Sequence, residues 1–475
     1  MFFSKKIKAF SRSVFVLSIV TIILSGAVFI YLMNTEYLSG RMLLIKIDEK
    51  LDLAPSIVKK QLRADIKFKN FTSSGLINKN HPRIVLPELA RWKGVGVSSL
   101  ILTRLAKHGI SKGQNESYCN SNQLLYIVHC WLTSNDEDIV EKAYKKMLEF
   151  ELNQPSADTT YSNGWQLALS YDLLYPALSF TQRTLIEQKI TQALNDTLLN
   201  LDEEFSSLWH GRLTHASIAW LCAVVLSDKV VGVTELQRRA QGHFLNAVDA
   251  ITYTEVWPGG YNYWIQSRAF LLALASSAYI NGVAESGNTD KVKSVMKKVG
   301  YWMVYATRPD NKIEGYGDEG SRVDLKDETQ RVIDLIVQMT RDPILAGYSK
   351  YLGQLHGQEG YYRGYRWGRL LFNDPSVLAM GDGTLSSIGR YLRLARMFGQ
   401  RTTNYAYLRS GWSVDDTFIS FKAGHAFSHH GHYDAGHFTV FKGSPLAINS
   451  STYNGFFNPH RLNYAIRTVA KNSLL

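Results

Sequence analysis

The stretch His430–Lys442, which reads HGHYDAGHFTVFK, decides how the C-terminal part of the chain folds. From His437 to Lys442 its residues alternate, and alternation is typical of a strand with one buried face. Thr417–Lys422 alternates in the same way, and Gly443–Pro445 provides a turn into a further apolar segment. We therefore expect an antiparallel sheet in the C-terminal residues 396–475.

Upstream of this sheet, from about residue 81 to about residue 390, the apolar pattern is that of helices. Apolar residues recur at intervals of three and four between Ile218 and Val225, and Phe270–Ile280 (FLLALASSAYI) is apolar almost all round. Helices this apolar are buried between other helices. Short breakers such as Pro258–Gly260 separate the segments, and no fixed repeat period occurs. We therefore expect a helical array rather than a standard solenoid.

The N-terminus carries the pattern of a membrane anchor. Val14–Met33 is a run of 20 uncharged residues, preceded only by basic charges at Lys5, Lys6, Lys8 and Arg12. At about 1.5 Å per residue, a helix of this length matches a hydrocarbon core about 30 Å thick. We expect residues 1–34 to form a cytoplasmic flank and a single transmembrane helix, and residues 35–80 to form a stalk or linker.

This orientation places the rest of the chain outside the cytoplasm, facing the periplasm if the membrane is a bacterial inner membrane. A cleaved signal peptide is the alternative, although its apolar region is normally shorter. Both interpretations export the remainder of the chain.

The charge balance suits an anionic partner, with plain solubility as the alternative explanation. The 475 residues include 53 Lys and Arg against 41 Asp and Glu, a net charge of +12, of which four charges belong to the N-terminal flank. Nucleic acid is excluded as a partner because the chain is exported and has no zinc-finger, RRM or bZIP pattern. An anionic polysaccharide or an anionic lipid surface fits better.

The three cysteines exclude a disulfide scaffold in so long a chain. Cys119, Cys130 and Cys222 have no CxxC spacing, which argues against a zinc-thiolate site. We expect them to act as buried small apolar residues.

Histidines are concentrated at the start of the predicted sheet. Five of the thirteen lie between positions 425 and 437: His425, His429, His430, His432 and His437. On a strand, His430 and His432 project from the same face. The two rings could bind a metal together, or one could bind a metal while the other acts as a base.

Several segments resemble the heparinase II/III-like polysaccharide lyases. The most specific are HGHYDAGHF (His430–Phe438), GSPLAIN (Gly443–Asn449) and RTVAKN (Arg467–Asn472). Weaker matches are HPRIVL (His81–Leu86), SYDLLY (Ser170–Tyr175), PGGYNY (Pro258–Tyr263) and the pair Gly317-Asp318. The resemblance implies an incomplete α/α toroid over residues 81–395, followed by an antiparallel β-sandwich. Residues 396–475 would form only the start of that sandwich, so we expect this sequence to be truncated.

The resemblance also implies a reaction, the β-elimination of an acidic polysaccharide that contains uronic acid. A base removes the proton at C5, the C4–O bond breaks, and an acid protonates the leaving oxygen while a cation neutralises the carboxylate. The alternative is a non-catalytic protein that binds or assembles acidic glycans on the same scaffold. Hydrolysis ranks last because it needs two opposed carboxylates, and no convincing pair is present.

By resemblance, His430 is the catalytic histidine, and His215 helps to neutralise the carboxylate. Alginate-acting members have Asn before that histidine, where this chain has Thr214, a weaker partner for a carboxylate. The catalytic tyrosine is Tyr261 or Tyr263, and we prefer Tyr263.

Three more residues are candidates for binding substrate. Arg268 is a contact for a carboxylate or sulfate, although residues 263 and 268 share no face on a regular helix, so a break between them is required. Trp264 and Tyr453 are candidates for stacking on sugar rings, with core packing as the alternative.

No cofactor is required for this chemistry, and zinc is a doubtful one. In the family, zinc is held by the second histidine of HxH, here His432, and by a later Asp and a later His. Asn449 and Lys471 stand at those later positions and are poor ligands. The Lys471 ammonium could instead take the place of the ion. Asp318 is expected to fix a turn or to orient a neighbour.

Overall fold

The computed structural model describes residues 80–85, 116–117, 119–134, 136–152, 163–203, 211–284, 287–319, 324–325, 328–360, 366–400, 402–424, 430–450 and 458–473, and the single residues 77, 453 and 455. The predicted anchor (1–34) and nearly all of the predicted stalk (35–80) lie outside these residues, as do His425 and His429. Among the helices that the structure describes, none combines the length and the apolar character needed to cross a membrane.

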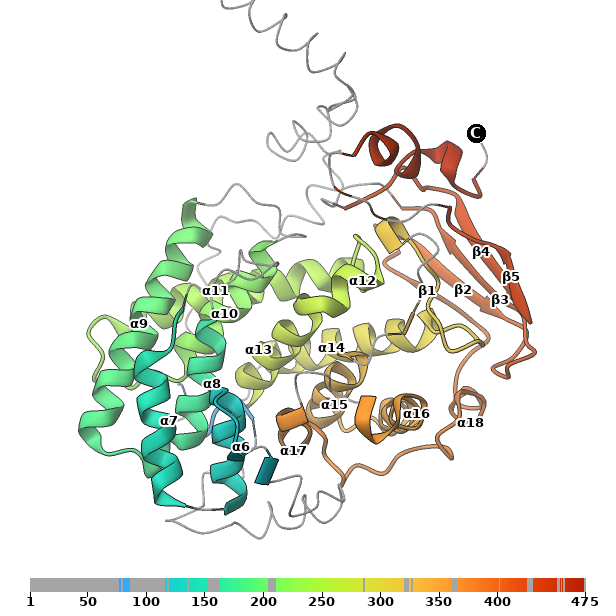
Figure 1. The fold of residues 1–475 in the computed structure, drawn as a ribbon. Coiled ribbons are helices and arrows are strands. Elements are labelled where there is room, and N and C mark those ends of the chain that lie inside the picture. The colour runs from blue at the N-terminus through green and yellow to red at the C-terminus, as the bar shows by residue number, and fades with distance from the viewer. Residues whose placement is uncertain are drawn as a thin grey trace, which may run out of the picture.

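The helices pack in two layers (Figure 1). In the inner layer each helix contacts the next: α6 (Leu124–Ser134), α8 (Gly164–Leu174), α10 (Leu213–Val224), α13 (Ala269–Gly282), α15 (Glu328–Thr340) and α17 (Arg369–Phe372). The outer layer follows the same course: α7 (Glu137–Glu149), α9 (Phe180–Glu203), α11 (Val233–Thr254), α14 (Gly287–Ala306) and α16 (Pro343–Gly360). Two short helices, α12 (Tyr261–Tyr263) and α18 (Leu385–Gly389), lie in the connections.

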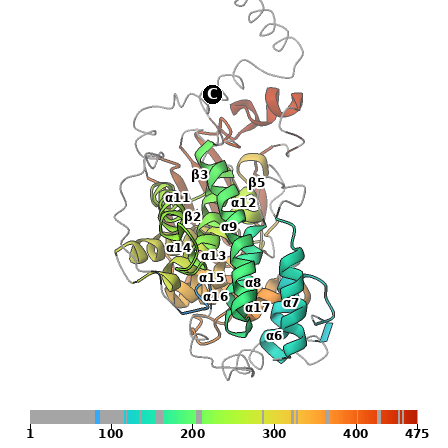
Figure 2. The ribbon, with the colours of Figure 1, turned by 90° about the vertical axis from the view of Figure 1, so that its left-hand side faces the viewer.

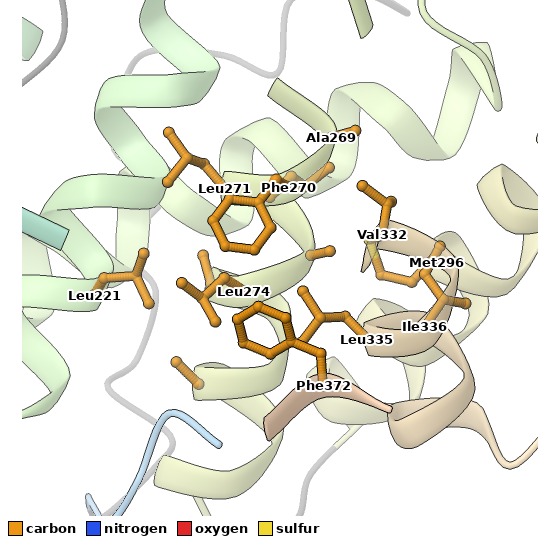
Figure 3. Close-up of a cluster of buried hydrophobic side chains, with 14 of the residues drawn as sticks. Leu221, Ala269, Phe270, Leu271, Leu274, Met296, Val332, Leu335, Ile336 and Phe372 are labelled. Atoms are coloured by element: carbon orange, nitrogen blue, oxygen red, sulfur yellow. The ribbon is translucent and has the colours of Figure 1, made fainter. Parts of the chain in front are cut away.

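The sequence explains which helices form which layer. All residues of α10 are buried, as the almost wholly apolar run from Ser217 predicts. By contrast, α7 buries only Val140, Ala143 and Met147, one stripe at intervals of three and four. Figure 3 shows the apolar interior, where Phe270 of α13 lies near Phe372 of α17.

The inner layer returns to its starting point. The 3₁₀ turn Arg366–Gly368 packs against α6, and the carbonyl of Trp367 accepts a hydrogen bond of 3.0 Å from Nδ1 of His129. The described helices therefore follow a circuit around a shared apolar core.

The C-terminal residues form one five-stranded antiparallel sheet in the order β1-β2-β3-β4-β5. The strands are β1 (Ala395–Phe398), β2 (Tyr405–Arg409), β3 (Phe418–Lys422), β4 (His437–Lys442) and β5 (Ser444–Ala447). One face packs on the helices, where Trp302 of α14 donates a hydrogen bond of 2.9 Å to the hydroxyl of Tyr407. Figures 1 and 2 place the sheet on the side of the molecule opposite α9.

These observations confirm the predicted mainly helical fold with a C-terminal antiparallel sheet. The predicted start of a β-sandwich stays a prediction, because the described C-terminal residues form one antiparallel sheet. The outer face of this sheet carries apolar side chains that are 38–44% exposed: Leu408, Phe421 and Phe438.

The prediction for the cysteines was wrong for two of the three. Cys119 and Cys130 form a disulfide bond that ties the residues before α6 to the middle of that helix. The separation of 11 residues did not indicate the disulfide bond, because the pairing depends on the path that the chain takes before α6. Cys222 is buried in α10, as expected.

Candidate active site

The site is built where the helical part meets the loop before β4. Tyr263 ends the short helix α12, and His430 lies in this loop. Their rings are stacked, with centroids 3.8 Å apart and planes 18° from parallel. A sugar ring cannot enter between two rings this close, so a substrate would approach their edges.

One carboxylate, that of Asp318, binds both histidines of the HxH pair. Oδ2 of Asp318 lies 2.7 Å from Nδ1 of His430, and Oδ1 lies 2.7 Å from Nε2 of His432. The guanidinium of Arg461 donates to the same two oxygens, at 3.1 Å and 3.3 Å. The expectation that His430 and His432 lie on a strand was wrong, because both lie in the loop before β4, and it is this loop that brings their rings to one acceptor.

The charge state of Asp318 determines which ring nitrogens of His430 and His432 carry a proton. Burial alone would raise the pKa of Asp318, but the hydrogen bonds from His430 and His432 and the charge of Arg461 hold that pKa well below its usual range. An ionised carboxylate only accepts hydrogen bonds, so the proton of a neutral His430 lies on Nδ1. The lone pair that a base needs is then on Nε2, the nitrogen directed away from Asp318.

Two glycines allow the three segments of the site to meet. A Cβ on Gly317, where φ is +63°, would lie 3.1 Å from the carbonyl oxygen of Gly259 and 3.7 Å from that of His430. A Cβ on Gly259 would lie 3.6 Å from Cβ of His430. The turn that carries Asp318 can therefore lie this close to the Pro258–Gly260 loop because residue 317 has no side chain.

The break required between Tyr263 and Arg268 is present. Trp264–Arg268 forms a π-helical turn, and Nη1 of Arg268 donates to the carbonyl of Tyr263 at 2.8 Å. The guanidinium lies 5.5 Å from the centre of the Tyr263 ring and 5.6 Å from that of Trp257. A cation is thus held beside the stacked pair, as π-turns at functional sites often allow.

Tyr453 forms the exposed side of the site. Its ring is nearly perpendicular to those of Tyr263 and His430, at centroid distances of 6.5 Å and 6.1 Å. Its backbone N–H donates to the carbonyl of Asp318 at 3.2 Å. At 39% exposure, against 7% for His430, Tyr453 is the aromatic residue of the site best placed to meet a sugar.

Three predicted site residues need correction because they lie in the core. Tyr261 is 1% exposed and its hydroxyl pairs with Oγ1 of Thr329, and burial raises the pKa of that phenol. Trp264 is 1% exposed and packs on Trp257 and Trp302, which leaves no ring face for a sugar. Thr214 has no exposed surface at all. Tyr263 therefore remains as the candidate tyrosine.

His215 is buried in α10, which packs against the π-helical turn Trp264–Arg268. Its place in the fold is therefore next to the element that carries Arg268. Its predicted role toward a carboxylate stays a prediction.

The residues at the predicted zinc position do not fit a zinc ion. His432 is bound to Asp318, and Asn449 accepts a hydrogen bond of 2.6 Å from the ammonium of Lys471. A protonated lysine repels a cation, and an amide oxygen is a weak zinc ligand. Within the described ranges, no three His, Cys, Asp or Glu side chains converge as a metal site would require.

No local pattern pointed to Arg461, which lies 31 residues beyond His430 and outside every matched segment. The pair Gly317-Asp318 belongs to a matched segment, and Asp318 was expected to fix a turn or to orient a neighbour. That one carboxylate serves both histidines became visible only in the structure.

Comparisons with known proteins find distant structural neighbours. No family model matches the chain, and no curated protein does. A heparan sulfate lyase, HepC from Pedobacter heparinus, has a TM-score of 0.42 at 12% identity over 76% of this chain and 57% of its own. A heparinase III gene product gives 0.41 at 12% over 76% and 59%, and another heparinase III gives 0.36 at 15% over 70% and 50%.

This chain thus spans at most 59% of the length of these neighbours. The likeness is distant, concerns the fold alone and assigns no activity to the chain.

Proposed function

We propose that this protein is a polysaccharide lyase that cleaves an acidic, uronate-containing polysaccharide by β-elimination. One observation carries the proposal: the stacked rings of His430 and Tyr263, with Asp318 bound to Nδ1 of the histidine. This arrangement supplies a base and an acid side by side, which is what elimination requires. The resemblance of His430–Phe438 to the heparinase II/III-like lyases supports the same reaction.

In this reaction, Nε2 of His430 takes the proton from C5 of the uronate. The electron pair of the C5–H bond forms the C4–C5 double bond, and the C4–O bond breaks. The hydroxyl of Tyr263 donates its proton to the leaving oxygen. The proton held by His430 then returns to the phenolate of Tyr263, directly or through water, which restores the site.

Positive charge is needed where the carboxylate gains electron density. Arg268 lies beside the Tyr263 ring and is the candidate for this contact. His215 is the second candidate, from the neighbouring helix α10. Tyr453 would stack on a sugar ring at the exposed edge.

We further propose that the protein is exported and stays attached to the bacterial inner membrane by its N-terminal helix, facing the periplasm. The charge pattern of residues 1–34 supports this location. The Cys119–Cys130 disulfide supports it independently, because such bonds persist mainly in oxidising compartments.

Glycan binding without catalysis is the second candidate function. The low exposure of His430, 7%, favours it, because a base must reach the C5 proton. Binding and elimination differ in one product, the conjugated double bond, so they are separated by a single assay.

The test is to incubate the purified protein with alginate, heparan sulfate and other uronate polymers and to follow the ultraviolet absorbance of the unsaturated product. We expect activity, and we expect His430→Ala and Tyr263→Phe to lower kcat by at least about 10²-fold, the usual contribution of an acid or base. His460→Ala and Tyr253→Phe, at exposed positions, are the matched controls and should leave kcat unchanged.

Full activity in His430→Ala would show that this residue is not the base. Binding of a polymer without any absorbance change would favour the second candidate function.

A further inference from the structure

Lys471 is a buried lysine connected to the site through one amide. Its ammonium donates a hydrogen bond of 2.6 Å to Oδ1 of Asn449, and Lys471 is 8% exposed. Nδ2 of Asn449 in turn donates to the carbonyl of Gly317 at 3.0 Å. Gly317 directly precedes Asp318, so the lysine, the amide and the turn that orients both histidines form one connected series.

The backbone around Lys471 is held in place by its neighbours. The side chain of Asn472 donates to the carbonyls of Phe438 and Ile448, both at 2.9 Å. The hydroxyl of Ser450 donates to the carbonyl of Ala470 at 2.7 Å. Lys471 is thus fixed to the end of the sheet, unlike a lysine on a mobile surface segment.

The buried charges around Lys471 are not balanced. Lys422 pairs with Asp434 at 2.6 Å, and Arg461 pairs with Asp318. Lys471 has a neutral amide as its hydrogen-bond partner. All five charged groups are less than 9% exposed. They comprise three cations and two carboxylates, namely Lys422, Arg461 and Lys471 together with Asp318 and Asp434. With neutral histidines, the cluster therefore carries a surplus of one positive charge.

Burial lowers the pKa of Lys471 to about 8, while the nearby carboxylate of Asp434 opposes the shift. The lysine is therefore still mostly protonated at neutral pH. The charge of Lys471 also acts on the site. The pKa of His432 is lowered first by burial and second by the positive charge of Lys471.

Two buried acceptors lie in the same region. Nδ1 of His432 and Oδ2 of Asp434 have no hydrogen-bond partner among the residues that the structure describes. An ammonium carries three donors and can satisfy acceptors of this kind, directly or through water. A zinc ion would also attract them, but it would have to lie beside the ammonium groups of Lys422 and Lys471.

We propose that Lys471 is a positioning residue that supplies the fixed positive charge of this site, and that the site functions without a metal ion. The surplus charge favours the further negative charge that the carboxylate of the sugar gains during elimination. This inference rests on the proposed function, since it identifies Lys471 as the source of the positive electrostatic field in which His430 and Tyr263 act.

The first arm of the test removes the charge and keeps the hydrogen bond. Lys471→Gln retains an amide donor for Asn449 and should lower kcat about tenfold or more, the usual effect of an orienting residue, with KM nearly unchanged because Lys471 touches no substrate. Lys471→Arg keeps the charge and should recover most of kcat. Lys442→Gln, at an exposed position on β4, is the control and should behave as the parent.

A structural defect would lower the melting temperature of Lys471→Gln and Lys471→Arg alike. Loss of the charge alone would instead lower kcat in Lys471→Gln and not in Lys471→Arg. Activity of a folded Lys471→Gln within twofold of the parent would overturn the proposal.

The second arm of the test uses the parent protein and does not depend on its enzymatic activity. The parent protein, purified in the presence of zinc and then dialysed, should contain far less than one zinc per chain, and a chelator should leave its melting temperature unchanged. One tightly held zinc per chain would overturn the proposal even if elimination is observed. A parent without elimination on any uronate polymer would instead refute the proposed function, while the metal content would still decide this inference.

Discussion

At the scale of single residues, Asp318 connects more of the site than any other described side chain. It accepts from His430, His432 and Arg461 while only 6% exposed. Because its two oxygens are divided between the two rings, one carboxylate fixes both ring orientations and both tautomers. An orienting group of this kind acts on the reaction through the base that it holds.

Exchanging Asp318 for Asn tests this role. The amide has one oxygen, so one histidine must face an NH₂ group and lose its acceptor, and the buried Arg461 loses its counter-charge. We expect Asp318→Asn to lower kcat at least tenfold and to cost about 3–5 kcal/mol of stability, as breaking a buried ion pair does.

Kinetics on a uronate polymer and a chemical unfolding curve measure the two effects of Asp318→Asn. Asp382→Asn, in an exposed turn, should change neither. An active and fully stable Asp318→Asn protein would contradict the role assigned to the carboxylate.

At the scale of elements, the site depends on the close contact of two loops and a turn. The 3₁₀ turn Gly317–Glu319 contacts the Pro258–Gly260 loop through backbone atoms, with no side chain between them. The π-helical turn Trp264–Arg268 then places Arg268 near the stacked rings. Small shifts of either turn would separate the groups that must act together.

Substitutions at two glycines with nearly equal φ separate the effect of backbone strain from the effect of a steric contact. Gly317 (φ +63°) and Gly443 (φ +64°) both have left-handed conformations, but only a Cβ on Gly317 meets other atoms, at 3.1 Å. We expect Gly443→Ala to cost about 1–2 kcal/mol from strain alone and to keep full kcat.

Gly317→Ala should cost more than Gly443→Ala and should reduce kcat at least fivefold, because the turn that carries Asp318 must move away from the carbonyl of Gly259. Urea unfolding and steady-state kinetics of both variants give the comparison. Equal behaviour of the two variants would show that the close contact has no role.

At the scale of the whole molecule, the sheet is joined to the helical circuit through buried polar groups as well as apolar packing. Trp302 of α14 donates to the hydroxyl of Tyr407 of β2, which donates to Oε1 of Glu314 at 3.1 Å. Glu314 is 2% exposed. Burial raises its pKa to about 8, although Tyr407, Arg409 and Arg308 oppose the shift.

This raised pKa makes the junction sensitive to pH. From pH 4.5 to about 8 the folded state holds a proton on Glu314 that the unfolded chain has lost, so the free energy of unfolding falls with rising pH in this window and levels off above it. The full loss is on the order of 5 kcal/mol.

Glu314→Gln keeps an acceptor for Tyr407 and removes the titration. We expect the variant to match the parent near pH 5 and to exceed its stability by several kcal/mol at pH 9, as measured by urea unfolding. Glu149→Gln, on the exposed side of α7, should stay within about 0.5 kcal/mol of the parent at each pH. A difference between Glu314→Gln and the parent that does not grow with pH would refute this account.

The local pattern of the sequence was enough to predict the helices and the antiparallel strands, because periodicity depends on neighbours within a few positions. It also indicated that a break must separate Tyr263 from Arg268. It was wrong in placing His430 and His432 on a strand, since both lie in the loop before β4. It could not place Trp264, Thr214 and Tyr261 in the core, since burial depends on what packs from elsewhere. The tertiary structure alone decided that Tyr263 stacks on His430 and that Asp318, 112 residues away, binds that ring. Contacts over such separations form only when whole elements pack, and no local pattern records them.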